Sequence, residues 1–357
     1  MNEIKENIRK YYLTFLDREP DSIGLEHYFK LIRDGKLKIQ DLEEIFKNSD
    51  EYKKISMSKK WNEKNPYIIS GKGDLFYKIS SGSVIDNIIE ERGMYDEAIL
   101  NSLTGIVPKN GIILDIGANV GGLTLPFAKI CVPSGTVFAF EPDIEVREQL
   151  LENIKINKLK NIIVNPIALQ DSLKTKLVTL FKRRAIHDDG RTNKGLSTIE
   201  KNPTYIQAEE IVKADTIDNF VSEKDIAKIN VIKIDVEGAD YKVLLGGKNT
   251  IGKDLPIIIY EFSPIIDDII RENNTKKCYE FLEKIGYIQI QILFSNKNKI
   301  LHEYSKNITE SDILCIHKSK MKEYKLSHPV YIEPNTPVDI KMKKEWNERT
   351  KIFWCNC

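Results

Sequence analysis

Two features that define membrane proteins and nucleic-acid-binding proteins are missing from this sequence. No apolar run approaches the roughly 20 residues of a transmembrane helix, and Met1–Asn7 is polar, without the apolar region of a signal peptide. The 54 Lys and Arg residues are balanced by 53 Asp and Glu residues, which gives a net charge of +1, and the two signs are interspersed. We therefore expect no transmembrane segment and, without a basic stripe, no nucleic-acid partner.

Cysteine is also scarce: the chain has five in 357 residues, an odd number, and most are far apart. Cys355-Asn356-Cys357 could bind a metal, form a strained disulfide or stay reduced. We favour ordinary reduced thiols, and with them a cytoplasmic protein. The histidines at 27, 302, 317 and 328 show no recognisable ligand spacing, and we predict no metal ligands.

The chain does contain enough apolar residues for a large core. Hydrophobic residues make up 41% and charged residues 30%, as expected of a soluble globular protein, and the length fits about two domains. Apolar residues recur at helical spacing over 4–16, 23–33 and 42–46, which predicts a small helical domain over 1–62. Residues 63–90 form a connecting segment, with a short strand expected at 75–79.

Strand and helix patterns then alternate, which predicts a doubly wound α/β fold with a mostly parallel sheet. Two further strands, 287–293 and 312–317, have no convincing helix between them and are expected to form an antiparallel edge hairpin. The expected strands of the alternating part are 111–115, 136–141, 161–167, 230–235 and 256–261, and the expected helices are 95–103, 122–131, 143–158, 239–246 and 275–285.

The most informative segment is the glycine-rich turn Asp115–Gly122, which follows an apolar strand and precedes a helix. Glu141 ends the next strand, 26 positions after Asp115. This order is typical of a nucleoside-bearing cofactor at the carboxyl edge of a parallel sheet. An NAD site would place a glycine first and an acid about 20 residues on, so S-adenosylmethionine is the better prediction. A glycine turn made only for chain geometry is the alternative without a ligand.

Each part of this cofactor needs a matching group. Gly117 lets the backbone approach the methionyl end, and Asp115 supplies negative charge toward the ammonium. Glu141, with Asp143 close by, can accept hydrogen bonds from both ribose hydroxyls. Asp171 and backbone groups after the third strand are expected to flank the adenine.

Further motifs resemble the FkbM family of S-adenosylmethionine-dependent methyltransferases. Val231–Asp240 resembles the family signature "KxDxEGxE", Asp115–Gly121 resembles "DxGANxG", and Phe140-Glu141-Pro142 resembles "FEP". Ala214–Phe220 is similar to its "TLDdf" segment. In Gly93–Asp96, Asp96 stands where the family usually has Glu. The resemblance covers residues from about 90 to 320.

This resemblance implies a class I (Rossmann-like) methyltransferase domain over 91–320, with a seven-stranded sheet. It implies O-methylation, often of a sugar hydroxyl in a polysaccharide, glycolipid or polyketide. It completes the predicted cofactor-binding set with Asp96, Ala118, Asn119, Gly121, Pro142, Ala168 and Asp235. Arg18–Leu25 with Tyr28 is similar to a small helical domain found beside enzymes of surface-glycan assembly. Residues 321–357 form a C-terminal extension to which we assign no role.

Methyl transfer to an alcohol requires a base or a metal near the sulfonium. Asp235 and Glu261 end neighbouring strands, where they could accept hydrogen bonds, act as the base or hold a divalent cation. His187, in a polar segment from 182 to 198 expected to be a lid over the site, is a third catalytic candidate or simply a solvent-facing side chain. Lys233 could pair with a carboxylate or contact substrate, and Glu237 could cap the next helix.

The leading hypothesis is an enzyme that methylates a hydroxyl of a glycan. A small metabolite, a lipid or a protein as the acceptor stays open. So does an inactive scaffold for glycan assembly, although the intact cofactor residues argue against it. The N-terminal helices are expected to serve a homodimer or a glycan-assembly partner.

Overall fold

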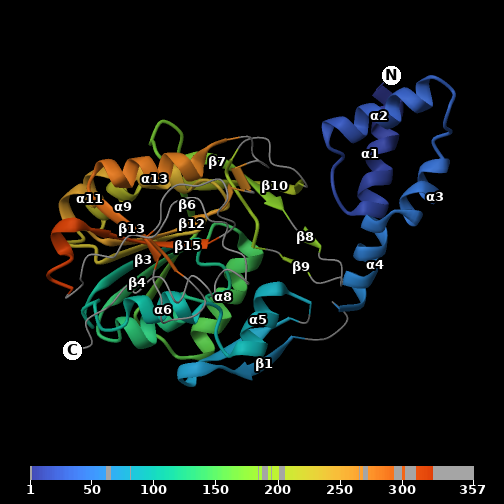
Figure 1. Cartoon of the computed structure of the whole chain (residues 1–357). Coiled ribbons are helices and arrows are strands. Elements are labelled where there is room, and N and C mark those ends of the chain that lie inside the picture. The colour runs from blue at the N-terminus through green and yellow to red at the C-terminus, as the bar shows by residue number, and fades with distance from the viewer. Residues whose placement is uncertain are drawn as a thin grey trace.

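The structure, a computed structural model, places a group of N-terminal helices beside a larger α/β body (Figure 1). It describes residues 2–61, 66–80, 82–183, 185–186, 192–193, 195–200, 206–264, 266–267, 272–292, 300–301 and 311–324. Within these residues, none of the helices combines the length and the apolar character needed to cross a bilayer. Most of the C-terminal extension, with Cys355 and Cys357, lies outside the described residues. The described cysteines, Cys131, Cys278 and Cys315, are buried free thiols.

The N-terminal part consists of α1 (Asn2–Leu16), α2 (Ser22–Arg33), α3 (Asp41–Asn48) and α4 (Asp50–Trp61). The first three helices lie where the periodicity predicted them, and α4 was not predicted. Their apolar faces meet in a core of their own that includes Ile8, Tyr12, Phe29, Leu42 and Phe46. The Asp21 side chain caps α2 by accepting a hydrogen bond from the Gly24 N–H at 2.8 Å.

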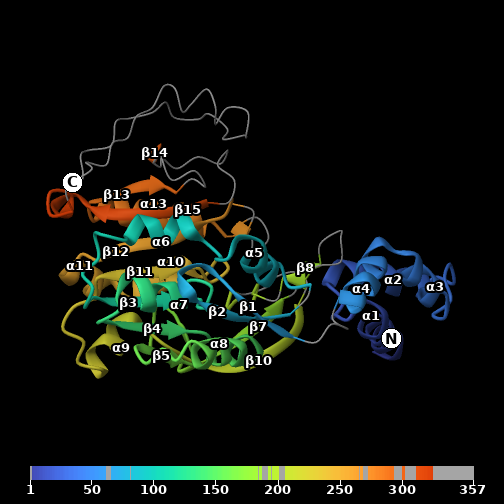
Figure 2. The same ribbon diagram turned by 90° about the horizontal axis from the view of Figure 1, so that it is seen from below.

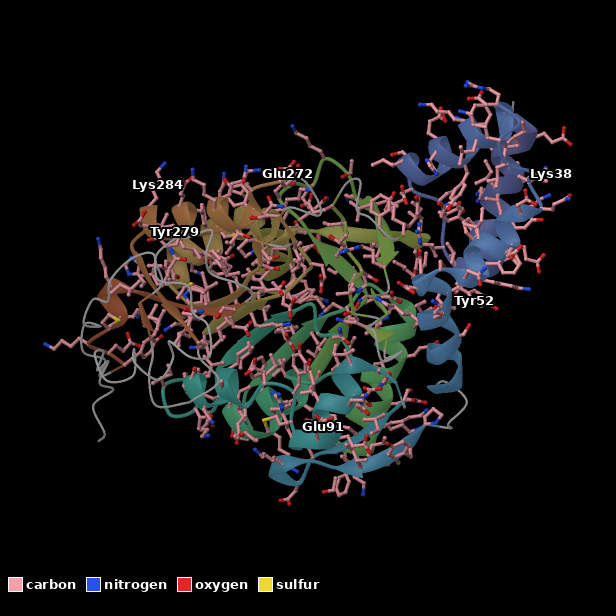
Figure 3. All side chains as sticks on the ribbon, turned by 45° about the vertical axis from the view of Figure 1, so that its right-hand side comes forward. Lys38, Tyr52, Glu91, Glu272, Tyr279 and Lys284 are labelled. Atoms are coloured by element: carbon pink, nitrogen blue, oxygen red, sulfur yellow. The ribbon has the colours of Figure 1, made fainter. Side chains whose placement is uncertain are left out.

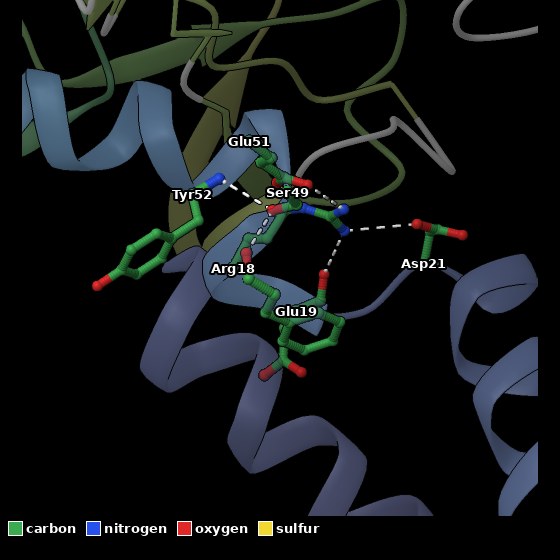
Figure 4. A network of polar contacts seen from close by, with 7 residues as sticks. Arg18, Glu19, Asp21, Ser49, Glu51 and Tyr52 are labelled. Carbon is green, nitrogen blue, oxygen red and sulfur yellow. Dashed lines mark hydrogen bonds and ion pairs between the residues drawn. The ribbon is translucent and has the colours of Figure 1, made fainter. Parts of the chain in front are cut away.

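Arg18 ties the α1–α2 connection to α4 (Figure 4). The residue is 8% exposed, and its guanidinium donates to both carboxylate oxygens of Glu51, at 2.6 and 3.1 Å. It also donates to the Glu19 carbonyl at 3.2 Å and to the Asp21 carboxylate at 3.4 Å, and it lies 5.0 Å from the centre of the Tyr12 ring. The arginine and aspartate of the N-terminal resemblance therefore have a structural role in joining the helices.

The main sheet has the strand order β14-β13-β15-β12-β11-β3-β4-β5. Figure 2 shows these strands side by side in this spatial order. The five strands from β12 to β5 run parallel, while β15, β13 and β14 are antiparallel to their neighbours. The predicted mostly parallel sheet with an antiparallel edge is confirmed. A two-residue strand, β14, lies outside the predicted hairpin. The strands are β3 (Ile112–Ile116), β4 (Thr136–Phe140), β5 (Ile162–Asn165), β11 (Val231–Ile234), β12 (Ile257–Phe262), β13 (Tyr287–Gln291), β14 (Ile300–Leu301) and β15 (Ser311–His317).

Helices cover both faces of this sheet, as expected of a doubly wound fold. On one face, α9 (Ile217–Glu223), α10 (Asp240–Gly246), α11 (Lys248–Asp254) and α13 (Asn274–Lys284) pack on strand residues such as Leu114 and Ile258. On the other, α6 (Glu97–Leu103) and the π-helical turn Phe127–Cys131, which continues α7 (Thr124–Pro126), pack on Ile113 and Ile259. Figure 1 shows α13 and α6 on opposite sides of the sheet.

A second, three-stranded sheet was not predicted. Its order is β6-β10-β7, formed by β6 (Ile167–Leu169), β10 (Ile206–Asp215) and β7 (Leu177–Arg183), and it buries Ala168, Leu180 and Val212 together. The prediction of a loop from 182 to 198 was therefore wrong at its start, because Lys182 and Arg183 end β7. Within the same segment, β8 (Ala185–Ile186) pairs with β9 (Thr192–Asn193). The catalytic candidate His187 lies outside the described residues.

The connecting segment is more structured than expected. It contains the hairpin of β1 (Tyr67–Ser70) and β2 (Phe76–Ile79), the latter close to the predicted strand, and most of α5 (Val84–Arg92). Buried residues of β2 and α5 pack with α8 (Ile144–Ile156) on the main body. Exposed charged side chains project from separate parts of the surface in Figure 3, as the balanced composition suggests, among them Lys38, Glu91, Glu272 and Lys284.

Candidate active site

A cavity of about 490 Å³ opens at the carboxyl ends of the parallel strands. Gly117 follows β3, Glu141 follows β4, Asp235 follows β11, and Glu261 lies near the end of β12, and all four line it. In an open α/β sheet this is the edge where ligands bind. Of the predicted residues, the cavity is lined by Gly117, Asn119, Glu141, Pro142, Asp143, Ala168, Asp235 and Glu261.

The Gly117 turn is shaped by close backbone approach. Gly117 has φ +78°, and a Cβ atom at this position would collide with the backbone carbonyl oxygen of Asp235. The Asp235 N–H donates to the Ile116 carbonyl at 3.1 Å, and Lys233 Nζ donates to the Gly117 carbonyl at 2.8 Å. Glycine is therefore required by space as well as by conformation.

Glu141 joins two loops of the site. Its Oε2 accepts a hydrogen bond from the Asn119 N–H at 2.9 Å, and its Oε1 accepts one from the Asp143 N–H at 3.0 Å. Burial raises the pKa of Glu141 to about 7 and outweighs these two hydrogen bonds, which act to lower it. Each carboxylate oxygen has a second lone pair, so the side chain can still accept from a ribose hydroxyl.

Asp115 lies behind the cavity wall rather than on it. It is fully buried, accepts a hydrogen bond from the Thr124 hydroxyl, and stands in register with Lys233 on the neighbouring strand. Its Oδ1 lies 3.6 Å from Lys233 Nζ. The structure thus gives this carboxylate a partner within the protein, and Asp115 does not line the cavity.

Lys233 is the counter-ion of this region. Its side chain is buried, and Nζ lies 3.4 Å from Asp235 Oδ2 as well as 3.6 Å from Asp115 Oδ1. Burial alone would lower the pKa of Lys233, but the two carboxylates outweigh it and raise the pKa above its usual range. Of the two roles considered for this lysine, pairing with carboxylates is confirmed.

Three more acids, Asp96, Glu261 and Asp312, lie near Asp235 and form with it what we call the acid end. Asp235 and Glu261 line the cavity, whereas Asp312 and the predicted cofactor-binding residue Asp96 do not. Glu261 on β12 stands directly opposite Asp312 on antiparallel β15. The Asp96 carboxylate caps α6 by accepting from the N–H groups of Ala98 and Ile99, at 3.0 and 3.1 Å.

The acid end carries more carboxyl groups than cations. Within the described residues, Glu261 Oε2 is buried without a hydrogen-bond partner. Burial, followed by the charge of Asp235, raises the pKa of Glu261 well above its usual range. Burial and the neighbouring Asp96 do the same for Asp312. In the described part of the chain, no group of three or more His, Cys, Asp or Glu residues is arranged to hold a metal ion.

The opposite wall is a strap of small and polar residues, Gly195–Ile199. Ser197 Oγ donates to Asp143 Oδ2 at 2.9 Å, and Thr198 Oγ1 donates to the Glu237 carbonyl at 2.9 Å. Two backbone hydrogen bonds, at 2.8 and 3.1 Å, join Thr198 to Phe181 of β7. The strap therefore links the second sheet to the loops after β4 and β11, and buried Arg183 lines the cavity beside it.

The remaining predicted residues do not line the cavity. Ala118 donates its N–H to the Phe140 carbonyl at 3.0 Å. Gly121 has φ +94°, and a Cβ atom there would collide with Leu125 and Leu150. Both therefore shape the turn from behind. Asp171 is exposed and lies away from the lining, where Ala168 and Leu169 stand instead.

The sequence did not point to Tyr95, Arg183 or Asp312. Tyr95 lines the cavity beside the glycine turn, against Gly122. A motif search has no reason to select an acid that begins an antiparallel strand or an arginine in an unexpected sheet. The only signal for Asp312 was a carboxylate directly before the apolar run Ile313–Ile316.

The strand order and the cavity at the carboxyl edge define a class I methyltransferase, whose methyl donor is S-adenosylmethionine. The site fits that donor: a glycine cradle for its backbone, a buried carboxylate after β4, and an excess of carboxyl groups for a cation. Residues 115–288 match the family model described as "Methyltransferase FkbM domain". The chain therefore carries a methyltransferase domain of the FkbM family, which confirms the resemblance.

Similar proteins support the same class. Methyltransferase 1 of Beauveria bassiana is 25% identical over 148 residues, which are 39% of this chain and 59% of that protein, so the chain spans less than two thirds of its length. Hexuronic acid methyltransferase AglP of Haloferax volcanii is 25% identical over 194 residues, 54% of this chain and 71% of that protein.

The solved structures that match include methyltransferase FkbM from Methylobacillus flagellatus KT. Its identity is 12%, the match covers 88% of this chain and 60% of that chain, and the TM-score is 0.36. TYW2 of M. jannaschii in complex with AdoMet has 15% identity, coverage of 71% and 85%, and a TM-score of 0.35.

Proposed function

We propose that this methyltransferase acts on a hydroxyl group of a sugar, in a surface glycan or glycolipid. The observation that carries the proposal is the pair of carboxyl groups, Asp235 and Glu261, on the wall of the cofactor cavity. Ile234 and Tyr260 are register partners on β11 and β12, so Asp235 and Glu261 follow at the same level on adjacent parallel strands.

This arrangement suits transfer to oxygen. The bound cofactor supplies an electrophilic methyl group on a sulfonium. An alcohol must lose its proton to become a good nucleophile, and a carboxylate within hydrogen-bond reach can take it. The Asp235 side chain is 32% exposed and can meet an acceptor hydroxyl, while Glu261 stands deeper, between Asp235 and Asp312.

Two observations support a sugar as the acceptor. One relative is named a hexuronic acid methyltransferase, and this chain matches 71% of it. The N-terminal segment Arg18–Leu25, with Tyr28, is similar to a helical domain found beside surface-glycan enzymes. We further propose that the domain over 1–62 recruits a glycan-assembly partner, while the domain over 91–320 performs the transfer.

The test is transfer of labelled methyl from S-adenosylmethionine to a panel of neutral and acidic glycans, small alcohols, lipids and proteins. We expect label on a glycan, in a methyl ether that survives mild alkali. Label lost to alkali would identify a carboxyl methyl ester and refute hydroxyl methylation. Label on a metabolite, lipid or protein would refute the glycan assignment. No cofactor binding at all would favour the inactive scaffold.

A further inference from the structure

We propose that Glu261 is the base of the reaction and that it becomes one only when the methyl donor is bound. It holds a proton in the free enzyme, releases it when the sulfonium cation enters the cavity, and takes the acceptor's proton during transfer. This inference rests on the proposed transfer to a hydroxyl for its chemical step, but its first step concerns the donor alone.

The geometry places the sulfonium near Glu261. The strand order at the cavity is β4, β3, β11, β12, and the buried carboxylate of Glu141 at β4 matches the ribose. From there the methionyl part of the donor has to cross the Gly117 turn after β3 to reach the remaining space. That space is walled by Asp235 and Glu261, after β11 and on β12.

The surroundings of Glu261 favour its protonated form while no cation lies beside it. The Arg183 guanidinium also lines the cavity, but its charge partner is Glu237. Asp312 stands directly opposite it across the strand pair, and the ammonium of Lys233 is already shared between Asp115 and Asp235. Like charges placed opposite each other in an antiparallel pair are destabilising. The charged or titratable groups of the elements packed around Glu261 are Tyr95 and Asp96 before α6, Asp115 on β3, Lys233 and Asp235 at β11, Glu237 and Asp240 at the start of α10, and Asp312 on β15.

A cation in the cavity reverses this preference. A positive charge within a few Å of a carboxyl group favours the ionised form, most strongly where water is excluded. Glu261 then gives its proton to solvent, and the cavity holds a sulfonium and a carboxylate. Glu261 lines the cavity, and its buried Oε2 has no hydrogen-bond partner within the described residues, so no protein donor to that oxygen has to be displaced before the carboxylate takes the acceptor's proton.

The charges balance in the chemical step. The acceptor oxygen forms a bond to the methyl carbon as the carbon–sulfur bond breaks, and the electrons of that bond stay on sulfur as a lone pair. The acceptor proton moves to Glu261. Cation and carboxylate are both neutralised, so the product state of the acid end has the same protonation as the free enzyme.

Isothermal titration calorimetry tests the first step without any acceptor. The full chain is titrated with S-adenosylmethionine and with S-adenosylhomocysteine at about pH 6.5, in two buffers that differ in ionisation enthalpy, and the protons released are compared. The two ligands share the ribose, so protons released by Glu141 cancel in the difference. We expect the sulfonium ligand to release about one proton more than its neutral product.

Three variants assign that proton. Glu261→Gln should abolish the difference while still binding the neutral product, which shows that the site is folded. Glu148→Gln, the same change at an exposed position of α8, should behave as the unchanged protein. Asp312→Asn should keep most of the difference, because burial and the charge of Asp235 favour the protonated form of Glu261 more strongly than Asp312 does. Equal proton release by both ligands, or a difference that survives in Glu261→Gln, would overturn the inference, and so would its loss in Asp312→Asn alone.

This result can be told apart from a failure of the proposed function. If proton release follows the prediction but no glycan is methylated, the donor-coupled base stands and the acceptor assignment falls. If a glycan is methylated without differential proton release, the base is not switched by the donor. If Glu261→Gln changes only the KM for the acceptor, its side chain faces the acceptor and not the sulfonium.

Discussion

Replacing Glu141 by glutamine changes one oxygen of a carboxylate into an NH₂ group while keeping the size of the side chain. In the structure both oxygens accept backbone N–H groups, from Asn119 and Asp143. The amide of glutamine can satisfy only one of these donors, and its NH₂ group then faces the other. The substitution therefore acts on the loops after β3 and β4 as well as on the ribose.

The expected loss can be worked out from these contacts. A charge-assisted hydrogen bond contributes about 1.5–3 kcal/mol, so losing one to a ribose hydroxyl weakens cofactor binding by roughly 10- to 150-fold. A backbone N–H left without an acceptor destabilises the fold by about 1–3 kcal/mol. Both effects are larger than those of an ordinary surface substitution.

The pH dependence gives a second, sharper signature. Burial raises the pKa of Glu141 from 4.5 to about 7, so folding favours its protonated form; that contribution is full below pH 4.5 and is lost as the pH rises through about 7. A ribose hydroxyl that donates to the carboxylate favours the ionised form. Affinity for S-adenosylhomocysteine should therefore fall as the pH drops below about 7, by up to about tenfold per pH unit.

Calorimetry of S-adenosylhomocysteine binding between about pH 5.5 and 8 measures both signatures. The unchanged protein should show the slope, and Glu141→Gln should bind weakly with a flatter profile. Thermal unfolding of the variant separates weaker binding from loss of fold. A flat profile in the unchanged protein, or full affinity in the variant, would show that the ribose is held elsewhere.

Three other substitutions test separate parts of the structure. Gly117→Ala should reduce S-adenosylhomocysteine affinity at least about tenfold, because its Cβ collides with the Asp235 carbonyl and the left-handed backbone costs about 1–2 kcal/mol; normal calorimetric affinity would contradict this. Asp235→Asn should keep that affinity within a few-fold but slow methyl transfer by roughly 10- to 100-fold, and an active variant would remove Asp235 from the reaction. Arg18→Leu should destabilise the N-terminal helices by about 1–3 kcal/mol, seen as faster hydrogen exchange over α1–α4, without changing cofactor binding.

The main sheet could be predicted because its parallel strands are buried on both faces. Val231–Ile234 is buried at every position, and so is Ile257–Tyr260. Such strands appear in a sequence as continuous apolar runs, each ended by a turn. The second sheet carries no such signal. β10 has Glu209 and Glu210 in its middle and an exposed Ile211, so its pattern is that of a surface strand, and its partners lie far away in the sequence.

The same reasoning separates the parts of the site that were predicted from those that were not. Asp235 and Glu261 could be found because parallel strands bring their carboxyl ends to one edge. Asp312 lies at the same edge, but β15 is antiparallel, so the residue is at the beginning of its strand. The position of Asp115 behind the wall depends on its register with Lys233, and spacing along the chain does not reveal a cross-strand register.

These positions lie on four neighbouring strands at two levels: Asp115 and Lys233 are register partners, and Asp235, Glu261 and Asp312 lie two residues further along. The Lys233 ammonium is paired with Asp115 and Asp235, while Glu261 and Asp312 stand opposite each other. Burying carboxyl groups without a cation is unfavourable, and neutral, protonated carboxyls are how a fold tolerates it. Because this arrangement lies beside the ligand cavity, the ligand-free protein is less stable than it would be with these carboxyl groups paired. In the mechanism proposed here a cationic ligand removes that imbalance, and the sulfonium of the methyl donor is a cation that the reaction itself then neutralises.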